Sequence, residues 1–285
     1  MRKGKFDYTG VFSSVFAIII GLLVGLVILM ICNPGQAFPG FVTILTGAFT
    51  HGAKGVGQVF YYSTTIILTG LSVGFAFKTG LFNIGASGQF IAGGFGAVYV
   101  GVMCENLGSM HWIVALVAGI CMGAIWGAVP GLLKAFFNVN EVISAIMMNY
   151  IGMYAVNWFV KSYKPIFNNL RNESKPVLSS ANIPKMGLDK IFPESSINGG
   201  FIIAVLAVIL VYIVLEKTTF GYELKAVGYN RDASRYAGIN EKKSIILSMV
   251  IAGAIAGLAG ACLYLAGTGK HIEIVDVIAD EGFTG

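Results

Sequence analysis

Residues 112–133 read WIVALVAGICMGAIWGAVPGLL, an apolar run of 22 residues without a charged side chain. A helix needs about 20 such residues to cross the hydrocarbon core of a membrane. Glycine recurs at every fourth position from Gly119 to Gly131, and the pair Gly253 and Gly257 has the same spacing. This spacing places the glycines on one helix face, where a second helix can approach closely. The stretch therefore predicts a membrane-spanning helix with a tightly packed face.

The composition of the whole chain agrees with this prediction. Of its 285 residues, 12% are charged, 56% are hydrophobic and 38 are glycine. Soluble domains average about 25% charged residues, so this composition excludes a soluble enzyme, a disordered chain and a disulfide-stapled secreted module. The four cysteines stand far apart in apolar stretches, which predicts small buried side chains rather than a zinc site or disulfides. The net charge of +5 requires no nucleic-acid partner.

Further apolar stretches of spanning length occur along the chain, giving seven in all. They cover about 11–32, 59–78, 81–104, 112–133, 142–160, 199–215 and 245–268. This pattern predicts an all-α fold, a polytopic membrane helix bundle in which 1–285 form a single transmembrane domain.

Glycine and proline also mark the region of the first span. Gly21 and Gly25 have the four-residue spacing of a close helix contact. Asn33-Pro34-Gly35 and Pro39-Gly40 predict chain breaks after this span. Residues 41–49 are apolar but too few to cross, so they predict an interfacial or partly inserted helix.

The distribution of positive charge predicts the orientation. With the N-terminus in the cytoplasm, 11 Lys and Arg residues lie inside and eight lie outside, as the positive-inside rule favours. Residues 161–198 are then an extracellular loop and 216–244 a cytoplasmic loop. No small-residue cleavage site follows the first span, which predicts a retained anchor. We therefore expect a multi-pass protein of the cell membrane whose N-terminus is cytoplasmic.

The motifs of common catalytic chemistry are absent from the sequence. It has no complete GxxxxGK[ST], HExxH or GxSxG motif, and the three histidines fall in connections where we expect solvated side chains. The predicted span interiors carry no Asp, Glu, Lys or Arg, whereas an ion-coupled carrier normally keeps such groups near the midplane. We expect a conduit powered by another protein, with no catalytic residue, metal or cofactor of its own.

Uncharged polar residues do occur at membrane depth. Residues 80–89 read GLFNIGASGQ, and this stretch has poor helix propensity because it contains three glycines. One interpretation is a broken helix that offers Asn83, Ser87 and Gln89 to a polar solute. The alternative is a packing face on which the two amides bond neighbouring helices. Asn149 has the same two interpretations.

Asn149 belongs to the segment 140–150, NEVISAIMMNY, which opens the fifth span. Asn140 is a good helix cap, and Glu141 complements the positive helix N-terminus. These two residues predict capping at a helix that could also take part in gating.

The loop segment 229–238 reads YNRDASRYAG. Asn230 suits an N-cap, Asp232 suits a first turn and Gly238 suits a C-terminal stop. The pattern predicts a helix of about two turns along the membrane surface. Such a helix could rest on anionic lipid, or it could dock a soluble partner.

Three segments in order resemble the permease subunits of ABC importers for simple sugars and nucleosides, a family similar to branched-chain amino-acid permeases. They are 78–89, KTGLFNIGASGQ; 140–150, whose form is closest to the nucleoside branch; and 220–239, FGYELKAVGYNRDASRYAGI. The sequence departs from the family pattern at Ser87, where many members carry Glu, and at Arg231, where proline is common. The resemblance covers most of the chain from Lys78 onward.

The resemblance implies a transport subunit that forms half of a translocation pathway for nucleosides, in contact with membrane lipid. Its implied partners are a second permease, identical or homologous, a cytoplasmic ATPase that hydrolyses ATP, and an extracellular substrate-binding lipoprotein. The implied pathway residues are Asn83, Ser87, Gln89 and Asn149. The implied ATPase-coupling residues are Asn230, Arg231, Asp232, Ala233, Arg235, Tyr236 and Gly238.

The same resemblance implies that 270–285 begin a re-entrant or spanning segment, so that the chain is a C-terminally truncated permease. Composition alone allows an acidic external tail here instead. Alternative functions are a permease for simple sugars or branched-chain amino acids and, more distantly, a membrane-embedded enzyme, which would need a titratable cluster. A structural membrane protein without a transport role is the remaining alternative.

Overall fold

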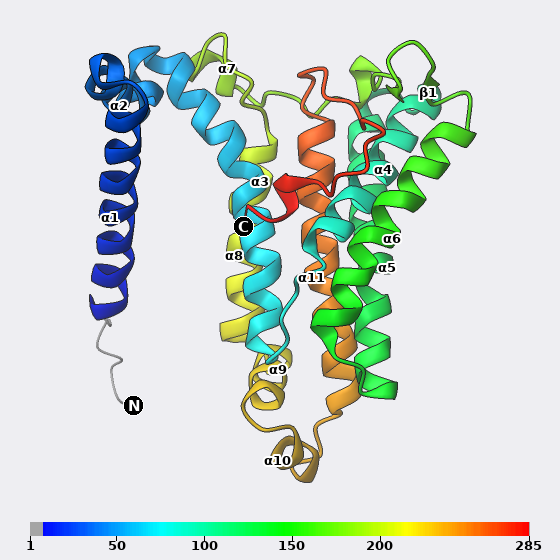
Figure 1. Ribbon diagram of the computed structural model, residues 1–285. Helices are drawn as coiled ribbons and strands as arrows, with labels where there is room; N and C mark the ends of the chain where they lie inside the picture. The colour runs from blue at the N-terminus through cyan, green and yellow to red at the C-terminus, as the bar shows by residue number, and fades with distance from the viewer. Residues whose placement is uncertain (1–7, 285) are drawn as a thin grey trace. The chain divides into compact units, whose positions relative to one another are not determined.

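The computed structural model describes residues 8–284. Within 8–14, the only side chains that it describes are those of residues 12 and 13. Its described part is mostly helical, as predicted (Figure 1). The helices are α1 (Tyr8–Cys32), α2 (Pro34–Thr50), α3 (Gly52–Lys78), α4 (Ala86–Met103), α5 (His111–Phe137), α6 (Glu141–Ser162), α7 (Leu188–Ile191), α8 (Gly200–Lys217), α9 (Thr219–Tyr229), α10 (Arg231–Tyr236) and α11 (Glu241–Tyr264). Short 3-10 helices η1 (Glu105–Met110), η2 (Ser179–Ala181) and η3 (Asp280–Gly282) and the two-stranded hairpin β1 (Phe167–Asn168) and β2 (Glu173–Ser174) complete it.

Within the described residues, 7 helical stretches are long and apolar enough to cross a membrane. They contain α1, α3, α4, α5, α6, α8 and α11, so the prediction of an all-α polytopic bundle is confirmed. Two boundaries differ most: α3 begins at Gly52 although the predicted span begins at 59, and α4 begins at Ala86 although the predicted span begins at 81. Residues 81–85 precede the helix because Asn83, Gly85 and the preceding Gly80 disfavour helical backbone.

The chain divides into two compact units, Met1–Val56 and Gly57–Gly285. In the first unit, α1 and α2 meet at Asn33, where the predicted break occurs and Pro34 occupies the start of α2. The break predicted at Pro39 is wrong, because α2 continues through this residue and includes 41–49. Within this unit, Gly21 and Gly25 make no close backbone contact, since a Cβ on either would meet no atom within 4 Å.

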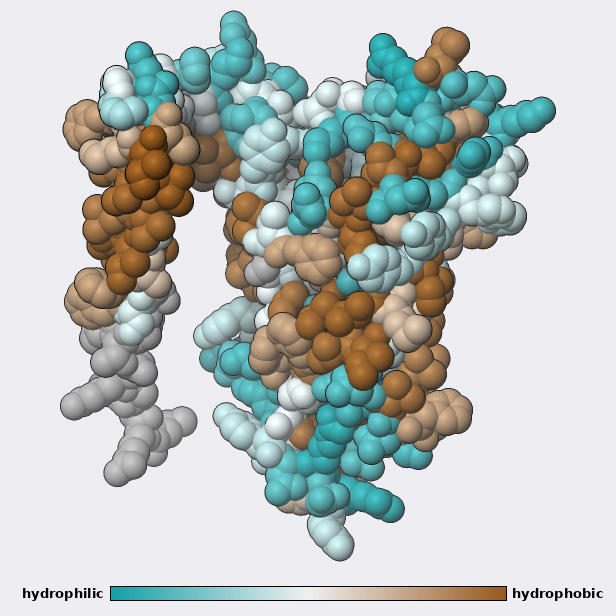
Figure 2. Space-filling model, viewed as in Figure 1, coloured by the Kyte–Doolittle hydropathy of each residue, from teal (hydrophilic) through white to brown (hydrophobic). Residues whose placement is uncertain are grey.

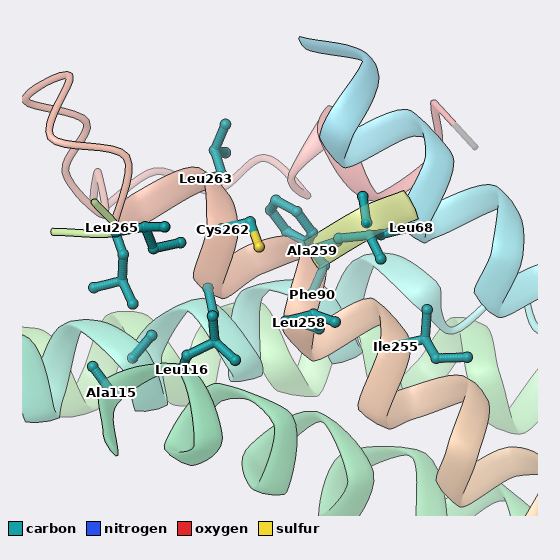
Figure 3. Close-up of a cluster of buried hydrophobic side chains, with 14 of the residues drawn as sticks. Leu68, Phe90, Ala115, Leu116, Ile255, Leu258, Ala259, Cys262, Leu263 and Leu265 are labelled. Atoms are coloured by element: carbon teal, nitrogen blue, oxygen red, sulfur yellow. The ribbon is translucent and has the colours of Figure 1, made fainter. Parts of the chain in front are cut away.

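The second unit is built around the contact between α5 and α11. A Cβ added to Gly123 would lie 2.6 Å from the Cα of Gly257, and one added to Gly127 would lie 3.0 Å from the Cα of Gly253. The predicted close approach at these glycines is therefore confirmed. Because no side chain separates the backbones, the two helices gain extensive van der Waals contact. Figure 3 shows the apolar side chains from α3, α4, α5 and α11 that form the adjoining core.

The second unit has two polar ends. We call the end formed by α9 and α10 the α10 end, and the end formed by residues 163–199 the loop end. Figure 2 shows hydrophilic surface at both ends and a hydrophobic belt between them. This arrangement fits a helix bundle surrounded by lipid.

Two predictions about single residue types need correction. His111 is fully buried rather than solvated. Both ring nitrogens have partners that make this burial possible, since Nδ1 lies 2.8 Å from Ser180 Oγ and Nε2 lies 3.0 Å from Val100 O. Of the cysteines, Cys262 is buried, but Cys32 and Cys121 are exposed on their helices. Apolar surroundings in the sequence did not distinguish a helix face toward protein from one toward lipid.

Candidate functional site

The first candidate region is the non-helical segment between α3 and α4. After Lys78 the chain leaves the helix at Thr79, and Gly80 adopts a φ of +70°, which a residue with a side chain rarely adopts. Thr79 Oγ1 donates a 2.7 Å hydrogen bond to Ser248 Oγ on α11. A Cβ on Gly80 would lie 3.1 Å from the carbonyl oxygen of Gly228 in α9. The segment therefore contacts both the core helix α11 and the α10 end.

Asn83 and Gln89 form a reciprocal amide pair across the start of α4. Asn83 Nδ2 donates to Gln89 Oε1 at 2.8 Å, and Gln89 Nε2 donates to Asn83 Oδ1 at 3.0 Å. Asn83 Nδ2 also donates to Ser72 Oγ of α3, whose hydroxyl donates to Ala252 O of α11. Both amides are 1% exposed. In this conformation the pair is closed to a solute and ties α4 to α3 and α11.

Asn149 of α6 provides the hydrogen bonds that the broken helix lacks. Its Nδ2 donates to Ile84 O at 2.9 Å, and its Oδ1 accepts from Gly88 N at 2.8 Å. The side chain is 2% exposed. Backbone groups without helical partners are costly inside a membrane, so this one amide stabilises the break. A Cβ on Gly88 would lie 2.8 Å from Asn149 Cα, which shows why glycine suits that position.

Ser87 lies beneath the returning C-terminal segment, residues 265–284. Its hydroxyl donates to Ala279 O at 3.0 Å, and a Cβ on Gly282 would collide with Ser87. Figure 1 shows this segment leaving α11 and passing back toward the start of α4. We call Asn83, Gln89, Asn149 and Ser87 the amide latch; the structure brings these four predicted pathway residues together around one short stretch of backbone.

An ion pair holds the returning segment. Lys270 Nζ and Glu281 Oε1 are 2.9 Å apart. Burial raises the pKa of the Glu281 carboxyl, but the hydrogen bond and the charge of Lys270 outweigh burial and leave the pKa below its usual range. Burial lowers the pKa of Lys270, but the bond and charge of Glu281 leave that pKa raised. Both groups are therefore charged at neutral pH.

The second candidate region is α9 and α10. Asn230 ends α9 and caps α10, because its Oδ1 accepts a 3.0 Å hydrogen bond from Ala233 N. Gly238 follows α10 with a φ of +83°, the left-handed conformation typical of a helix stop. The helix has 6 residues, which is close to the predicted length of about two turns. Asp232, Arg235 and Tyr236 are exposed, and Arg231 is half-buried.

A groove of about 540 Å³ lies between these two helices. Its lining includes Tyr222, Ala226, Tyr229, Ala233 and Ile239. Tyr222 and Tyr229 are 70% and 90% exposed, so large apolar surface accompanies the charged groups of α10. Such a combination is typical of a protein-binding surface.

Asn140 and Glu141 lie at the start of α6. Asn140 Oδ1 accepts from Val142 N at 2.9 Å, and Glu141 Oε2 lies 2.8 Å from Lys134 Nζ. This cap and ion pair fix the turn between α5 and α6 at the α10 end. Nothing in their geometry identifies a moving gate.

Sequence reasoning missed three polar residues that belong to the same region. Ser72 and Ser248 complete the hydrogen bonds of the break, and Asn157 of α6 lies eight residues after Asn149. Since eight residues are about two helical turns, the spacing of the two asparagines placed them on one face. That spacing was the signal available in the sequence.

No group of three or more His, Cys, Asp or Glu side chains that could hold a metal occurs in the described part of the chain. The contacts of the break consist of amides, hydroxyls and backbone groups. These groups can bind a polar solute by hydrogen bonding.

Residues 55–283 match the family described as the branched-chain amino acid transport system / permease component. The chain belongs to this family. The permease is therefore a multi-pass membrane protein with a transport role, and the ATPase of such a transporter is a separate subunit. ABC transporter partners such as an ATPase and a substrate-binding protein follow from the family.

Curated relatives with high similarity come from bacteria and an archaeon. The permease is 37% identical to the guanosine ABC transporter permease protein NupP of Bacillus subtilis, covering 90% of this chain and 73% of that protein. It is 36% identical to the nucleoside ABC transporter permease protein NupB of Lactococcus lactis, covering 82% and 65%. It is 29% identical to the glucose ABC transporter permease protein TsgB13 of Haloferax volcanii, covering 77% and 58%. No solved structure matches.

Proposed function

We propose that the permease forms half of the translocation pathway of an ATP-driven nucleoside importer. The observation that carries this proposal is the amide latch, because it places uncharged hydrogen-bonding groups at a helix break within the bundle. A nucleoside is uncharged and has many donors and acceptors, so exchange of hydrogen bonds with amides and hydroxyls suits it. Similarity to the guanosine and nucleoside permeases supports the same substrate class.

We place the α10 end in the cytoplasm, together with the N-terminus, and the loop end outside the cell. Lys78, Lys134 and Lys217 lie in the last turns of α3, α5 and α8. All three helices finish at the α10 end, and the positive-inside rule favours this placement. An extracellular binding lipoprotein would then deliver substrate to the loop end.

We propose that a cytoplasmic ATPase docks on α10 and the groove beside it. The coupling set is Asn230, Arg231, Asp232, Ala233, Arg235, Tyr236 and Gly238. The contact between Gly228 of α9 and Gly80 gives the docking site a direct connection to the broken segment. Closure of two ATPase subunits would move α9 and thereby bias the latch between closed and open states.

A second permease, identical or homologous, would complete the pathway. In the closed state, Asn83, Ser87, Gln89 and Asn149 bond one another or the backbone, as the structure shows. In the open state, the same groups would bond the passing solute. The segment 270–284 is, in this proposal, a re-entrant segment of the membrane domain.

Sugar transport is the second candidate function, because the glucose permease relative is 29% identical. Uptake of labelled guanosine, uridine, glucose and leucine by vesicles containing the full transporter distinguishes the candidates. We expect saturable, ATP-dependent uptake of guanosine or uridine. Uptake of glucose or leucine without uptake of either nucleoside would overturn the proposal.

The docking assignment has its own test. Ala233→Glu places a bulky acid in the exposed face of α10, beside the groove. We expect the variant to remain in the membrane and to lose most ATPase co-purification, whereas Ala233→Ser retains it. Normal co-purification from Ala233→Glu would contradict docking at α10.

A further inference from the structure

A cavity of about 320 Å³ lies beside the amide latch toward the loop end. Its walls come from α4, α6, the end of α11 and the returning segment. Ala279 lines this cavity, and its carbonyl oxygen accepts the hydrogen bond of Ser87. The volume lies at the small end of the range for ligand pockets, about 300–1,000 Å³. Its occupant would therefore be one small solute.

The cavity lining has an apolar and a polar part. Ile91, Tyr264, Val275 and Val277 supply apolar groups, and the Tyr264 ring lies 6.4 Å from the ring of Phe90. An aromatic ring among aliphatic side chains favours a flat, weakly polar ligand group.

Two polar side chains of the lining have unused hydrogen-bonding capacity. Asn157 is 8% exposed; its Nδ2 donates to Val275 O at 2.9 Å, but its Oδ1 has no partner among the described residues. His271 Nδ1 also has none there. A buried polar atom without a partner costs free energy. A small reorientation of either side chain toward a ligand that offers hydrogen bonds would remove this cost.

The charge of the lining disfavours an anion. Lys270 and Glu281 form a pair with each other at 2.9 Å, and Glu273 adds a further carboxylate. The lining is therefore formally acidic when His271 is neutral. A nucleotide phosphate would meet repulsion, and no unpaired cation is available in this lining for the carboxylate of an amino acid.

We propose that this cavity is the recognition site for a neutral nucleoside before it reaches the amide latch. The base lies against Tyr264, and the polar edge of the base or the ribose hydroxyls bond Asn157 and His271. This inference rests on the proposed function, because it names the residues that contact the nucleoside in the same pathway. The hydrogen bond from Ser87 to Ala279 O connects the latch to the lining of the site.

Direct binding of labelled guanosine and uridine to the purified permease–ATPase complex tests the site. Asn157→Leu keeps a similar volume but removes the amide. We expect about a fivefold to tenfold weaker binding, the loss of roughly one hydrogen bond. Asn182→Leu is the matched control, because Asn182 also has a buried Oδ1 without a partner but lies outside the cavity. We expect it to bind guanosine with the wild-type Kd.

Tyr264 gives a second, independent comparison. Tyr264→Phe keeps the ring and should retain guanosine binding, whereas Tyr264→Leu should weaken it by about tenfold, a free-energy loss in the lower part of the range for one base stack. ATPase co-purification reports whether each variant folds. If wild-type permease transports nucleosides but Asn157→Leu binds like Asn182→Leu, the recognition site is wrong. If the wild type neither binds nor transports nucleosides, the proposed function itself fails.

Discussion

The contact between α5 and α11 and the break before α4 are two contrasting ways of joining helices in one bundle. At the first, glycine faces glycine, and a Cβ on Gly257 would lie 2.8 Å from Gly123 Cα. At the second, amides and hydroxyls bond the backbone and one another. Close packing has one arrangement that fits, whereas hydrogen bonds can be exchanged for equivalent bonds to a solute. The comparison separates a rigid framework from a part that is able to switch.

The largest effect is expected when the glycine contact is filled. Gly257→Leu would force the backbones of α5 and α11 apart, because the obstacle is backbone and not a flexible side chain. We expect loss of most folded protein from the membrane, measured by size-exclusion chromatography of a fluorescent fusion. Gly74→Leu on α3 is the control, since a Cβ there meets no atom within 4 Å. Equal yields from both variants would contradict the framework assignment.

A smaller effect is expected at the break. Asn149→Leu leaves Gly88 N and Ile84 O without their partner, at a cost of about 1–3 kcal/mol for each buried group. We expect a lower Tm and reduced nucleoside uptake, because the start of α4 is no longer held. Tyr150→Leu changes the neighbouring residue, which is 50% exposed, and should leave both quantities close to wild type. A wild-type Tm for Asn149→Leu would show that other contacts hold the break.

The smallest effect is expected for the Lys270–Glu281 pair. The side chains are 39% and 40% exposed, so solvent limits the pair to about 0.2–1 kcal/mol. Because the pKa of Glu281 is lowered, its contribution is present above its ordinary value of 4.5 and is lost as the pH falls through the folded value. Because the pKa of Lys270 is raised, its contribution is present below 10.5 and is lost as the pH rises through the folded value.

Lys270→Met should therefore lower the Tm by a few degrees at most at pH 7. The difference should shrink as the pH falls below 4.5, where the wild type also loses the pair. Thermal unfolding of both proteins across this range gives the comparison, with Lys185→Met in the loop as the control. An equal deficit at pH 7 and in acid would assign the effect to packing of the lysine stem instead.

The framework was largely predictable from sequence, and the details of the break were not. Four-residue glycine spacing at Gly119–Gly131 and Gly253–Gly257 identified the tightly packed faces because the helical period fixes which residues share a face. The same spacing gives no close backbone contact within the first unit at Gly21 and Gly25, where a Cβ would meet no atom within 4 Å. Periodicity shows which residues share a face, but it does not identify the partner.

At the break, composition predicted the loss of helix but not the pairing of side chains. Asn83 and Gln89 are six residues apart, and Asn149 bonds residues that are 61 and 65 positions away. Contacts of such long range depend on how α4 and α6 pack, which local propensity does not determine. The burial of His111 was not predictable for the same reason. It lies in a predicted connection, but its ring nitrogens bond Val100 and Ser180, and Ser180 is 69 positions away.

The central claim is that the amide latch is closed in this conformation and opens when ATP drives transport. In a permease without its native cysteines, Ser87→Cys is a near-isosteric probe at a side chain that is 0% exposed. Ala259→Cys, also 0% exposed, is the control in the rigid core. We predict that a water-soluble maleimide labels Ser87→Cys only during ATP-driven nucleoside uptake and never labels Ala259→Cys. Continued uptake while Ser87→Cys stays unlabelled would contradict the claim.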